Sequence, residues 1–268
     1  MAEASDTDNA VLGLAVSLRS VSKIFDGGVT ALGPLDLDVR KGEFVSLLGP
    51  SGCGKSTALR LIAGLVAPTS GTVEVAHHQG ETQPGQRIGF VFQEPTLMPW
   101  TSVRENVRLP LRIAHVPPAQ SDARVDEALA HVGLTEFASA YPRELSGGMK
   151  MRASLARALV TDPDILLMDE PFAALDEITR FRLNNDLLRL WSNLNKTIIF
   201  VTHSVFESVY LSQRVVVMTD RPGRIGAEIA IDASEPRGED FRTSAEYAHL
   251  CRKVSGALAP SYSGKPAR

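Results

Sequence analysis

Residues Gly49–Ser56 (GPSGCGKS) follow the pattern G-x-x-x-x-G-K-[ST], in which a turn of the backbone surrounds phosphate groups. This phosphate loop stands between the apolar run Phe44–Leu48, which predicts a buried strand, and a helical pattern that begins at Ser56. Glycines let the backbone turn tightly so that its N–H groups converge, and the positive end of the following helix points at the same spot. We expect Lys55 to contact the β- and γ-phosphates and Ser56 to offer its hydroxyl to Mg²⁺. The alternative is a glycine-rich turn with a surface lysine. The predicted nucleotide-binding residues here are Gly49, Ser51, Gly52, Cys53, Gly54, Lys55, Ser56 and Thr57.

Two carboxylates follow a second apolar run. Ile165–Met168 predicts a buried strand, and Asp169 and Glu170 come directly after it. In an open parallel sheet the carboxyl end of one strand lies beside that of its neighbour, which is expected to bring Asp169 near Ser56. We expect Asp169 to hold Mg²⁺ through a water molecule and Glu170 to polarise the attacking water. Alone, a strand that ends in Asp-Glu is as often structural as catalytic. Together with the phosphate loop it predicts nucleotide hydrolysis.

The pattern around these motifs indicates an α/β fold. Strand patterns alternate with helical ones, and a helix-rich stretch interrupts them. We therefore expect a P-loop NTPase core, with a mostly parallel sheet flanked by helices, an N-terminal antiparallel β subdomain and an inserted helical subdomain. The expected organisation is one ATPase domain over 14–226, with the helical subdomain at about 95–160, and a C-terminal extension over 227–268 whose role the sequence does not reveal.

Composition narrows the class of protein. Hydrophobic residues make up 44% and charged residues 22% of the 268, which is ordinary for a globular protein. The formal net charge of −3 provides no basic field that would favour nucleic acid as a partner. Cys53 and Cys251 are the two cysteines, far apart, so we expect no disulfide and a reducing compartment. Met1–Ala10 lacks the basic start and apolar run of a secretory signal, so export is not indicated.

The segment Leu145–Met149 (LSGGM) is where the chain resembles the ATP-binding-cassette (ABC) family. In that family the serine and glycines, here Ser146, Gly147 and Gly148, grip the γ-phosphate of the ATP bound to the other subunit. Ser146 is also a good N-cap for the helix expected after it. Family members commonly have glutamine where Met149 stands, at the least chemically committed position of the motif.

The remaining family motifs occur in the family's order. The resemblance implies that Gln93 senses Mg²⁺ and water, that Asp176 belongs to a loop crossing a dimer interface, and that His203 contacts the γ-phosphate. It also implies that Phe25 stacks on adenine. A lone histidine is more often a capping or core residue, and the alternative for Phe25 is a core phenylalanine.

Within the family, residues 95–100, 171–180 and 201–225 resemble the nitrate/sulfonate/taurine group of bacterial importers. This resemblance implies ATP and Mg²⁺ as cofactors, and a second copy of the chain and membrane-spanning permease subunits as partners. A secreted solute-binding protein would act indirectly, and the chain would lie on the cytoplasmic face of the inner (plasma) membrane. The transported solute stays open, because the group also includes systems for other small organic molecules.

Two other functions fit parts of the pattern. Soluble cassette ATPases of translation or DNA repair usually have two cassettes or a long coiled-coil insertion, and often basic surfaces. Regulatory cassettes that bind nucleotide without hydrolysing it typically lose the general base or the LSGGM-type motif, whereas Glu170 and Ser146 are both present.

One surface is expected to dock the permease. Leu97, Met98 and Trp100 are apolar and lie in a segment with two prolines, between a core strand and the helical stretch, so we expect them to be exposed. The alternative is that Trp100 packs inside the helical subdomain.

Overall fold

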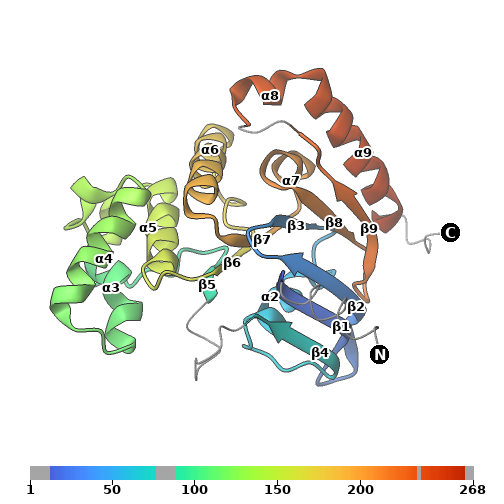
Figure 1. Cartoon of the computed structure of the whole chain (residues 1–268), viewed down its shortest axis with the longest axis horizontal. Coiled ribbons are helices and arrows are strands. Elements are labelled where there is room, and N and C mark those ends of the chain that lie inside the picture. Colours follow the sequence, from blue (N-terminus) through green and yellow to red (C-terminus); the bar gives the residue numbers. More distant parts are fainter. Residues whose placement is uncertain (1–12, 77–87, 234–236, 263–268) are drawn as a thin grey trace, which may run out of the picture. The chain divides into compact units, whose positions relative to one another are not determined.

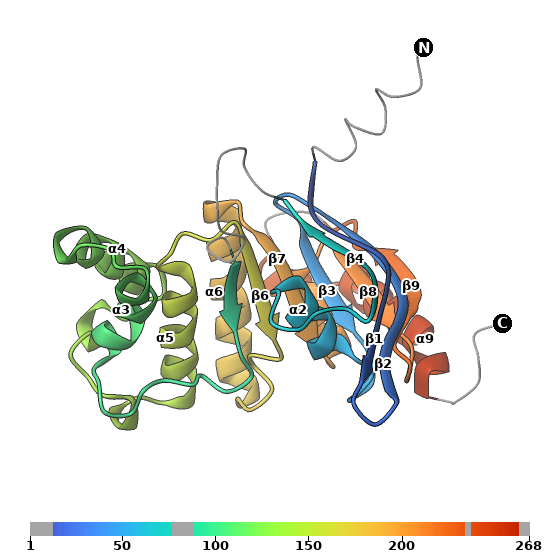
Figure 2. The same cartoon turned by 90° about the horizontal axis from the view of Figure 1, so that it is seen from below.

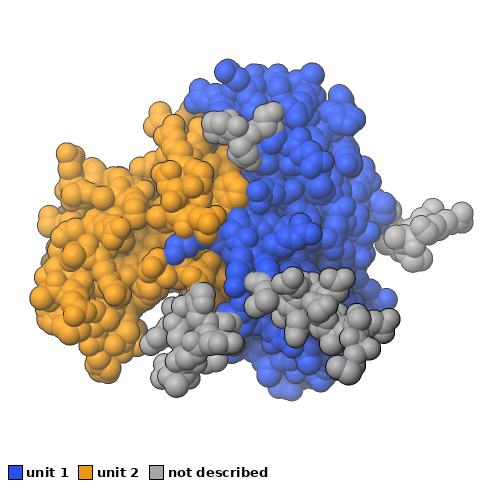
Figure 3. Space-filling view, viewed as in Figure 1, with its two compact units in different colours: residues 1–85, 196–268 blue, residues 86–195 orange. Residues whose placement is uncertain are grey.

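The computed structural model describes residues 13–76, 88–233 and 237–262 (Figure 1; second view in Figure 2). The Met1–Ala10 stretch therefore lies outside the described residues. The chain divides into two compact units, Met1–Gly85 with Lys196–Arg268 (unit 1) and Gln86–Asn195 (unit 2), which Figure 3 colours separately.

Unit 1 contains an antiparallel sheet with the strand order β2-β1-β4. Its strands are β1 (Leu14–Phe25), β2 (Val29–Arg40) and β4 (Ser70–Val75). In β2 the apolar residues Leu35, Leu37 and Val39 are buried and Asp36 is exposed, as the alternation in the sequence predicts. The central strand β1 is buried on both faces over Ala15–Leu18, whereas this part of β2 buries one face.

A second set of strands in unit 1 runs in the order β7-β3-β8-β9. β3 pairs in parallel with β7 and with β8, whereas β9 joins β8 antiparallel at the edge. Every residue of β3 and β7 is buried, which is the property of parallel strands covered on both faces. The bounds are β3 Phe44–Leu48, β7 Thr197–Thr202, β8 Arg214–Met218 and β9 Ile225–Ala230.

Helices cover both faces of these strands. Figure 1 shows α2 (Lys55–Ile62) on one face and α7 (Val205–Leu211) with α9 (Ala245–Tyr262) on the other. The short helix α8 (Glu239–Thr243) precedes α9. Helix α9 packs on α7, β8 and β9. The part of the chain after Gly226 that the structure describes thus forms the rest of β9 and two helices, none of which was predicted.

Unit 2 combines a parallel strand pair, β5 and β6, with helices. α3, α4 and α5 pack on one another, and α5 also packs on β5 and α6. The bounds are β5 Ile88–Val91, α3 Val103–Ile113, α4 Pro118–His131, α5 Gly147–Leu159, β6 Ile165–Asp169 and α6 Glu177–Leu194, with 3₁₀ turns at Thr135–Phe137 and Pro142–Glu144.

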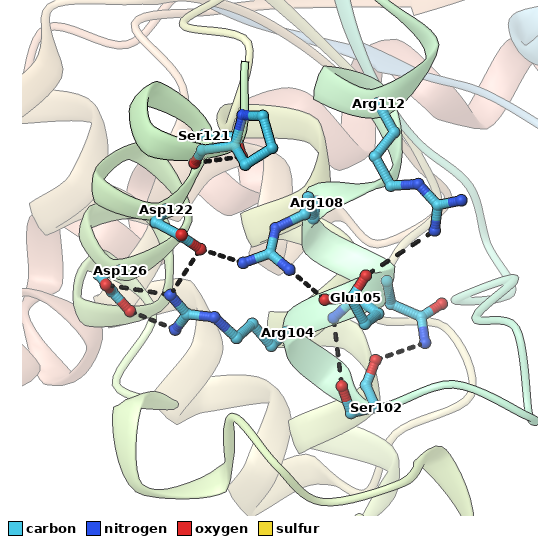
Figure 4. A network of polar contacts seen from close by, with 10 residues as sticks. Ser102, Arg104, Glu105, Arg108, Arg112, Ser121, Asp122 and Asp126 are labelled. Carbon is cyan, nitrogen blue, oxygen red and sulfur yellow. Dashed lines mark hydrogen bonds and ion pairs between the residues drawn. The ribbon is translucent and has the colours of Figure 1, made fainter. Parts of the chain in front are cut away.

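An ionic network joins α3 to α4 (Figure 4). Arg104 of α3 pairs with Asp122 and Asp126 of α4, and Arg108 pairs with Asp122 and with Glu105 of its own helix. The hydrogen bond from Arg104 lowers the pKa of Asp126, so this carboxylate stays ionised and the network stays charged at neutral pH. These ion pairs link the two helices, which also pack directly on each other.

The parallel strands flanked by helices and the separate antiparallel sheet confirm the predicted α/β class. Cys53 and Cys251 are both buried, and neither forms a disulfide. Among the described residues, no helix combines the length and apolarity needed to cross a bilayer.

Candidate functional site

The phosphate loop connects β3 to α2 in unit 1, as predicted. Gly52 and Gly54 have φ values of 78° and 106°, which L side chains rarely adopt. A Cβ atom at Gly54 would lie 2.6 Å from Cδ2 of Leu32 and 2.7 Å from the carbonyl oxygen of Ala31. Both the turn and the close approach of β2 therefore require glycine at this position.

The N-terminus of α2 carries no side-chain cap. Its N-cap residue is Gly54, which offers no side-chain acceptor to the first N–H groups of the helix. Lys55 is 4% exposed, and its Nζ donates hydrogen bonds to the carbonyl oxygens of Gly49 (2.8 Å) and Pro50 (2.9 Å). The positive end of a helix and a lysine ammonium thus lie at one turn, which is the arrangement that binds a phosphate anion.

The other residues of the phosphate loop and the first turn of α2 differ in their exposure to solvent. Ser51 is exposed, and Ser56 and Thr57 are half-buried in the first turn of α2. Cys53 is buried, and burial raises the pKa of its thiol. The thiol is therefore neutral at physiological pH, and Cys53 acts as a packed residue of the loop rather than as a nucleophile.

A second loop, Thr219–Arg224, supports the phosphate loop, and we name it the support loop. Nε of Arg221 donates to the carbonyl oxygen of Gly52 at 2.5 Å. A Cβ atom at Gly223 would lie 1.9 Å from the carbonyl oxygen of Cys53, so the two backbones touch there. The sequence patterns did not assign Arg221 to the site, because its contact joins residues far apart in the chain.

His203 is exposed and follows the last residue of β7. Thr202 pairs with Leu48 of β3 in parallel, so His203 and the phosphate loop leave the same edge of these strands. The structure thereby brings His203 and the phosphate loop to one edge of unit 1.

Hydrogen bonds fix the backbone on either side of His203. Oγ1 of Thr202 donates to Oε2 of Glu207 at 2.6 Å and accepts from the N–H of Ser204 at 3.0 Å. Oγ of Ser204 accepts from the N–H of Glu207 at 3.3 Å and so caps α7. His203 therefore lies in a turn whose backbone is held by hydrogen bonds on both sides.

Phe25 ends β1 and is 40% exposed. Nζ of Lys23 lies 5.3 Å from the centre of its ring, a cation–π distance. A side chain this exposed does not belong to the core, so the alternative that Phe25 is a core phenylalanine is not supported.

In unit 2, Asp169 ends β6 and Glu170 follows it, both half-buried. Glu170 has φ of 46°, in the left-handed region that a non-glycine residue enters at a cost. Val91 of β5 pairs with Met168 of β6 in parallel, so the exposed Gln93 leaves the same strand edge as the two carboxylates. The structure thus brings Gln93, Asp169 and Glu170 to one edge of unit 2.

Residues Leu145–Gly148, here named the LSGG segment, and Asp176 lie together in unit 2. Oγ of Ser146 accepts from the N–H of Met149 at 3.3 Å, which confirms the predicted N-cap of α5. Asp176 caps α6 by accepting from the N–H of Thr179 at 2.9 Å, and this bond lowers the pKa of Asp176. A Cβ atom at Gly148 would lie 2.7 Å from Cγ2 of Thr179, so the first turns of α5 and α6 touch.

The candidate residues therefore form sets within each unit. Unit 1 holds Phe25, the phosphate loop and His203, and unit 2 holds Gln93, the two carboxylates, the LSGG segment and Asp176. Over residues 13–76, 88–233 and 237–262, no group of three or more His, Cys, Asp or Glu side chains could hold a metal. A Mg²⁺ ion bound by a hydroxyl, an amide, one carboxylate and phosphate oxygens does not require such a group.

Comparisons with known proteins cover most of the chain. A family model described as "ABC transporter" matches residues 32–173, which include every candidate residue except Phe25, Asp176 and His203. The taurine import ATP-binding protein TauB of Jannaschia sp. is 46% identical over 251 residues, 91% of this chain and 93% of that protein. The aliphatic sulfonates import ATP-binding protein SsuB of Bacillus thuringiensis subsp. konkukian is 42% identical over 248 residues, 90% and 94% of the two chains. A solved ATP-binding cassette, dimeric and bound to ADP and Pi after hydrolysis, is 33% identical with a TM-score of 0.71, covering 82% of this chain and all of that one.

Proposed function

This chain belongs to the ABC transporter family and is an ATPase of that family, and we propose that it drives the import of a small sulfonate-type solute through a separate permease. The membership confirms the predicted family and the P-loop NTPase fold class. The importer assignment is supported by its 46% and 42% identity to proteins named for taurine and aliphatic sulfonate import.

The observation that carries the ATPase mechanism is the phosphate loop with the uncapped N-terminus of α2. We infer that the loop N–H groups and Lys55 hold the β- and γ-phosphates of ATP, with Lys55 turning from the carbonyl oxygens that it contacts to the phosphates. The backbone turn is already formed, so little ordering is needed on binding. Phe25 offers its exposed ring to the adenine.

Water activation is assigned to unit 2. We propose that Glu170 orients the attacking water and accepts its proton, and that Gln93 helps to place that water. Ser56, Gln93 and Asp169 are the proposed Mg²⁺ ligands, directly or through water. A Mg²⁺ ion held by these residues would supply positive charge to offset the negative charge of the phosphates. His203 donates a hydrogen bond to the γ-phosphate, from a turn that the Thr202–Glu207 bond holds in place.

A second copy of the chain is the proposed partner in hydrolysis. Ser146, Gly147 and Asp176 are exposed at the first turns of α5 and α6, where they are available to a nucleotide on another copy. The solved relative bound to ADP and Pi is a dimer, which supports this assembly.

The permease is proposed to dock at the segment that follows Gln93. Trp100 is 74% exposed, as expected, so it does not pack inside unit 2. Leu97 and Met98 are half-buried, which corrects the expectation that they would be exposed. The reason is that Arg157 donates to the carbonyl oxygens of Pro95 and Thr96, and the Asn106 side chain bonds both backbone groups of Met98.

Substituting the docking residue tests the transport assignment. Trp100→Ala is expected to lower co-purification with the permease while ATP binding is retained, because an exposed tryptophan can serve as an interface anchor. Ile113→Ala is the matched control, since Ile113 is 70% exposed on α3. Equal assembly of the two variants would contradict docking at Trp100.

The solute and the location are tested with the assembled transporter. Taurine or another sulfonate is expected to stimulate ATP hydrolysis in vesicles that hold the permease, this chain and a secreted binding protein, with the ATPase peripheral on the cytoplasmic face. The alternative function is a soluble cassette ATPase without a permease. Failure to assemble with any multispanning protein would favour that alternative.

A further inference from the structure

Arg237 is a buried cation at the C-terminal end of α7. It is 7% exposed, and its Nη1 donates to the carbonyl oxygens of Val209 (3.1 Å), Tyr210 (3.1 Å) and Ser212 (2.7 Å). These carbonyl groups belong to the last turn of α7 and to its C-cap residue Ser212, where a helix leaves its acceptors without partners of its own. A guanidinium there also complements the negative end of the helix.

Tyr247 of α9 contacts the other end of the same helix. Its hydroxyl donates to the carbonyl oxygen of Phe206 at 2.9 Å, in the first turn of α7. Burial raises the pKa of Tyr247, so the hydroxyl remains a donor across the physiological range. The ring of Tyr247 meets those of Tyr210 and Phe241 edge-on, which packs α7, α8 and α9 together.

Helix α7 depends on such contacts because it has only seven residues, too few to be stable alone. Its N-terminus is attached to β7 through Thr202, Ser204 and Glu207, and His203 lies within that attachment. Its remaining residues pack on β3, β7 and β8, and Arg237 and Tyr247 hold them from the side of the C-terminal segment. A shift of α7 would therefore move the turn that carries His203.

We propose that Arg237 and Tyr247 are positioning residues for ATP hydrolysis, which act by holding α7 so that His203 keeps its orientation. The proposal assigns a role to the C-terminal segment, for which the sequence patterns indicated none. It rests on the proposed contact of His203 with the γ-phosphate. Neither side chain is assigned a contact with nucleotide.

The test measures kcat and KM for ATP in the full-length protein, with His203→Ala as the reference. Arg237→Ala is expected to lower kcat about tenfold or more with little change in KM, because several charge-assisted hydrogen bonds to α7 are lost. Tyr247→Phe is expected to lower kcat about two- to tenfold, since it removes one hydroxyl and keeps the ring. Arg252→Ala, an exposed arginine of α9, is the matched control and should keep the wild-type kcat.

A double variant separates positioning from general support of the fold. If Arg237 acts through His203, Arg237→Ala combined with His203→Ala should have the kcat of His203→Ala alone. A double variant whose kcat falls by the product of the two single effects would overturn the proposal. So would an unchanged kcat in Arg237→Ala or, should that variant not fold, in Tyr247→Phe. If His203→Ala itself keeps full activity, the proposed role of His203 fails. This failure can be told apart from a failure of the Arg237 and Tyr247 proposal, because it is measured in a variant whose C-terminal segment is unchanged.

Discussion

Replacing Arg221 with alanine should weaken ATP binding without removing a residue that touches ATP. Nε of Arg221 donates to the carbonyl oxygen of Gly52 at 2.5 Å and so holds the phosphate loop by its backbone. With this carbonyl held toward Arg221, the loop N–H groups are expected to stay directed at the proposed phosphate position. In the variant the loop has to be ordered again each time a nucleotide binds.

The size of the effect follows from the one hydrogen bond that is lost. A hydrogen bond to a charged group contributes about 1.5–3 kcal/mol where it is buried. Arg221 is exposed, so water replaces much of the bond, and about 0.5–1.5 kcal/mol remains. The dissociation constant of ATP should therefore rise about two- to twelvefold.

Arg224→Ala is the matched control because it removes the same charge from the same support loop. Nε of Arg224 donates to the carbonyl oxygen of Gly33 at 2.8 Å. Gly33 lies in β2 and not in the phosphate loop. Binding is measured calorimetrically at low and high salt, since long-range attraction between arginine and ATP is screened and a contact effect is not. An equal loss of affinity in both variants, or a loss in Arg221→Ala that vanishes at high salt, would refute the support of the phosphate loop by Arg221.

Three further outcomes test the proposed mechanism. Glu170→Gln should bind ATP normally and lower kcat by about two orders of magnitude or more in single-turnover assays, because ordering the water matters chiefly in the transition state; near-normal turnover would remove Glu170 from its role. Lys55→Ala should raise the dissociation constant of ATP, because it deletes a charge contact with the phosphates; an unchanged constant would count against the phosphate loop. The ATPase rate of the isolated chain should rise faster than linearly with protein concentration, since each proposed site needs Ser146 to Gly148 of another copy; a strictly linear rate from monomers would contradict a shared site.

Structural features that depend on residues close together in the chain could be predicted from the sequence. The phosphate loop needs glycines where φ is positive, and β2 alternates because one of its faces is buried, so both are visible as local patterns. The N-cap at Ser146 is equally local, because its acceptor and donor are three residues apart.

Structural features that depend on contacts between residues far apart in the chain could not be predicted from the sequence. Arg221 meets Gly52 across 169 positions, and no local pattern encodes that contact. Leu97 is half-buried, in a segment that Arg157 of α5 holds from 61 positions away at Thr96. The sequence holds a weak pattern for helix α9, which small and polar residues partly hide. The pattern consists of residues at helical spacing that are buried in the structure, namely Tyr247, Leu250, Cys251, Val254 and Leu258.

The close approach of α5 to α6 bears on how sequences descended from this one could change. A Cβ atom at Gly148 would lie 2.7 Å from the side-chain methyl group of Thr179 in the same chain. A larger residue at position 148 therefore requires Thr179 to move or to be replaced, whether or not that copy ever meets a nucleotide on another. In sequences descended from this one, positions 148 and 179 should consequently change together. The residue at position 170, the proposed general base, is the one to inspect for lost ATP hydrolysis.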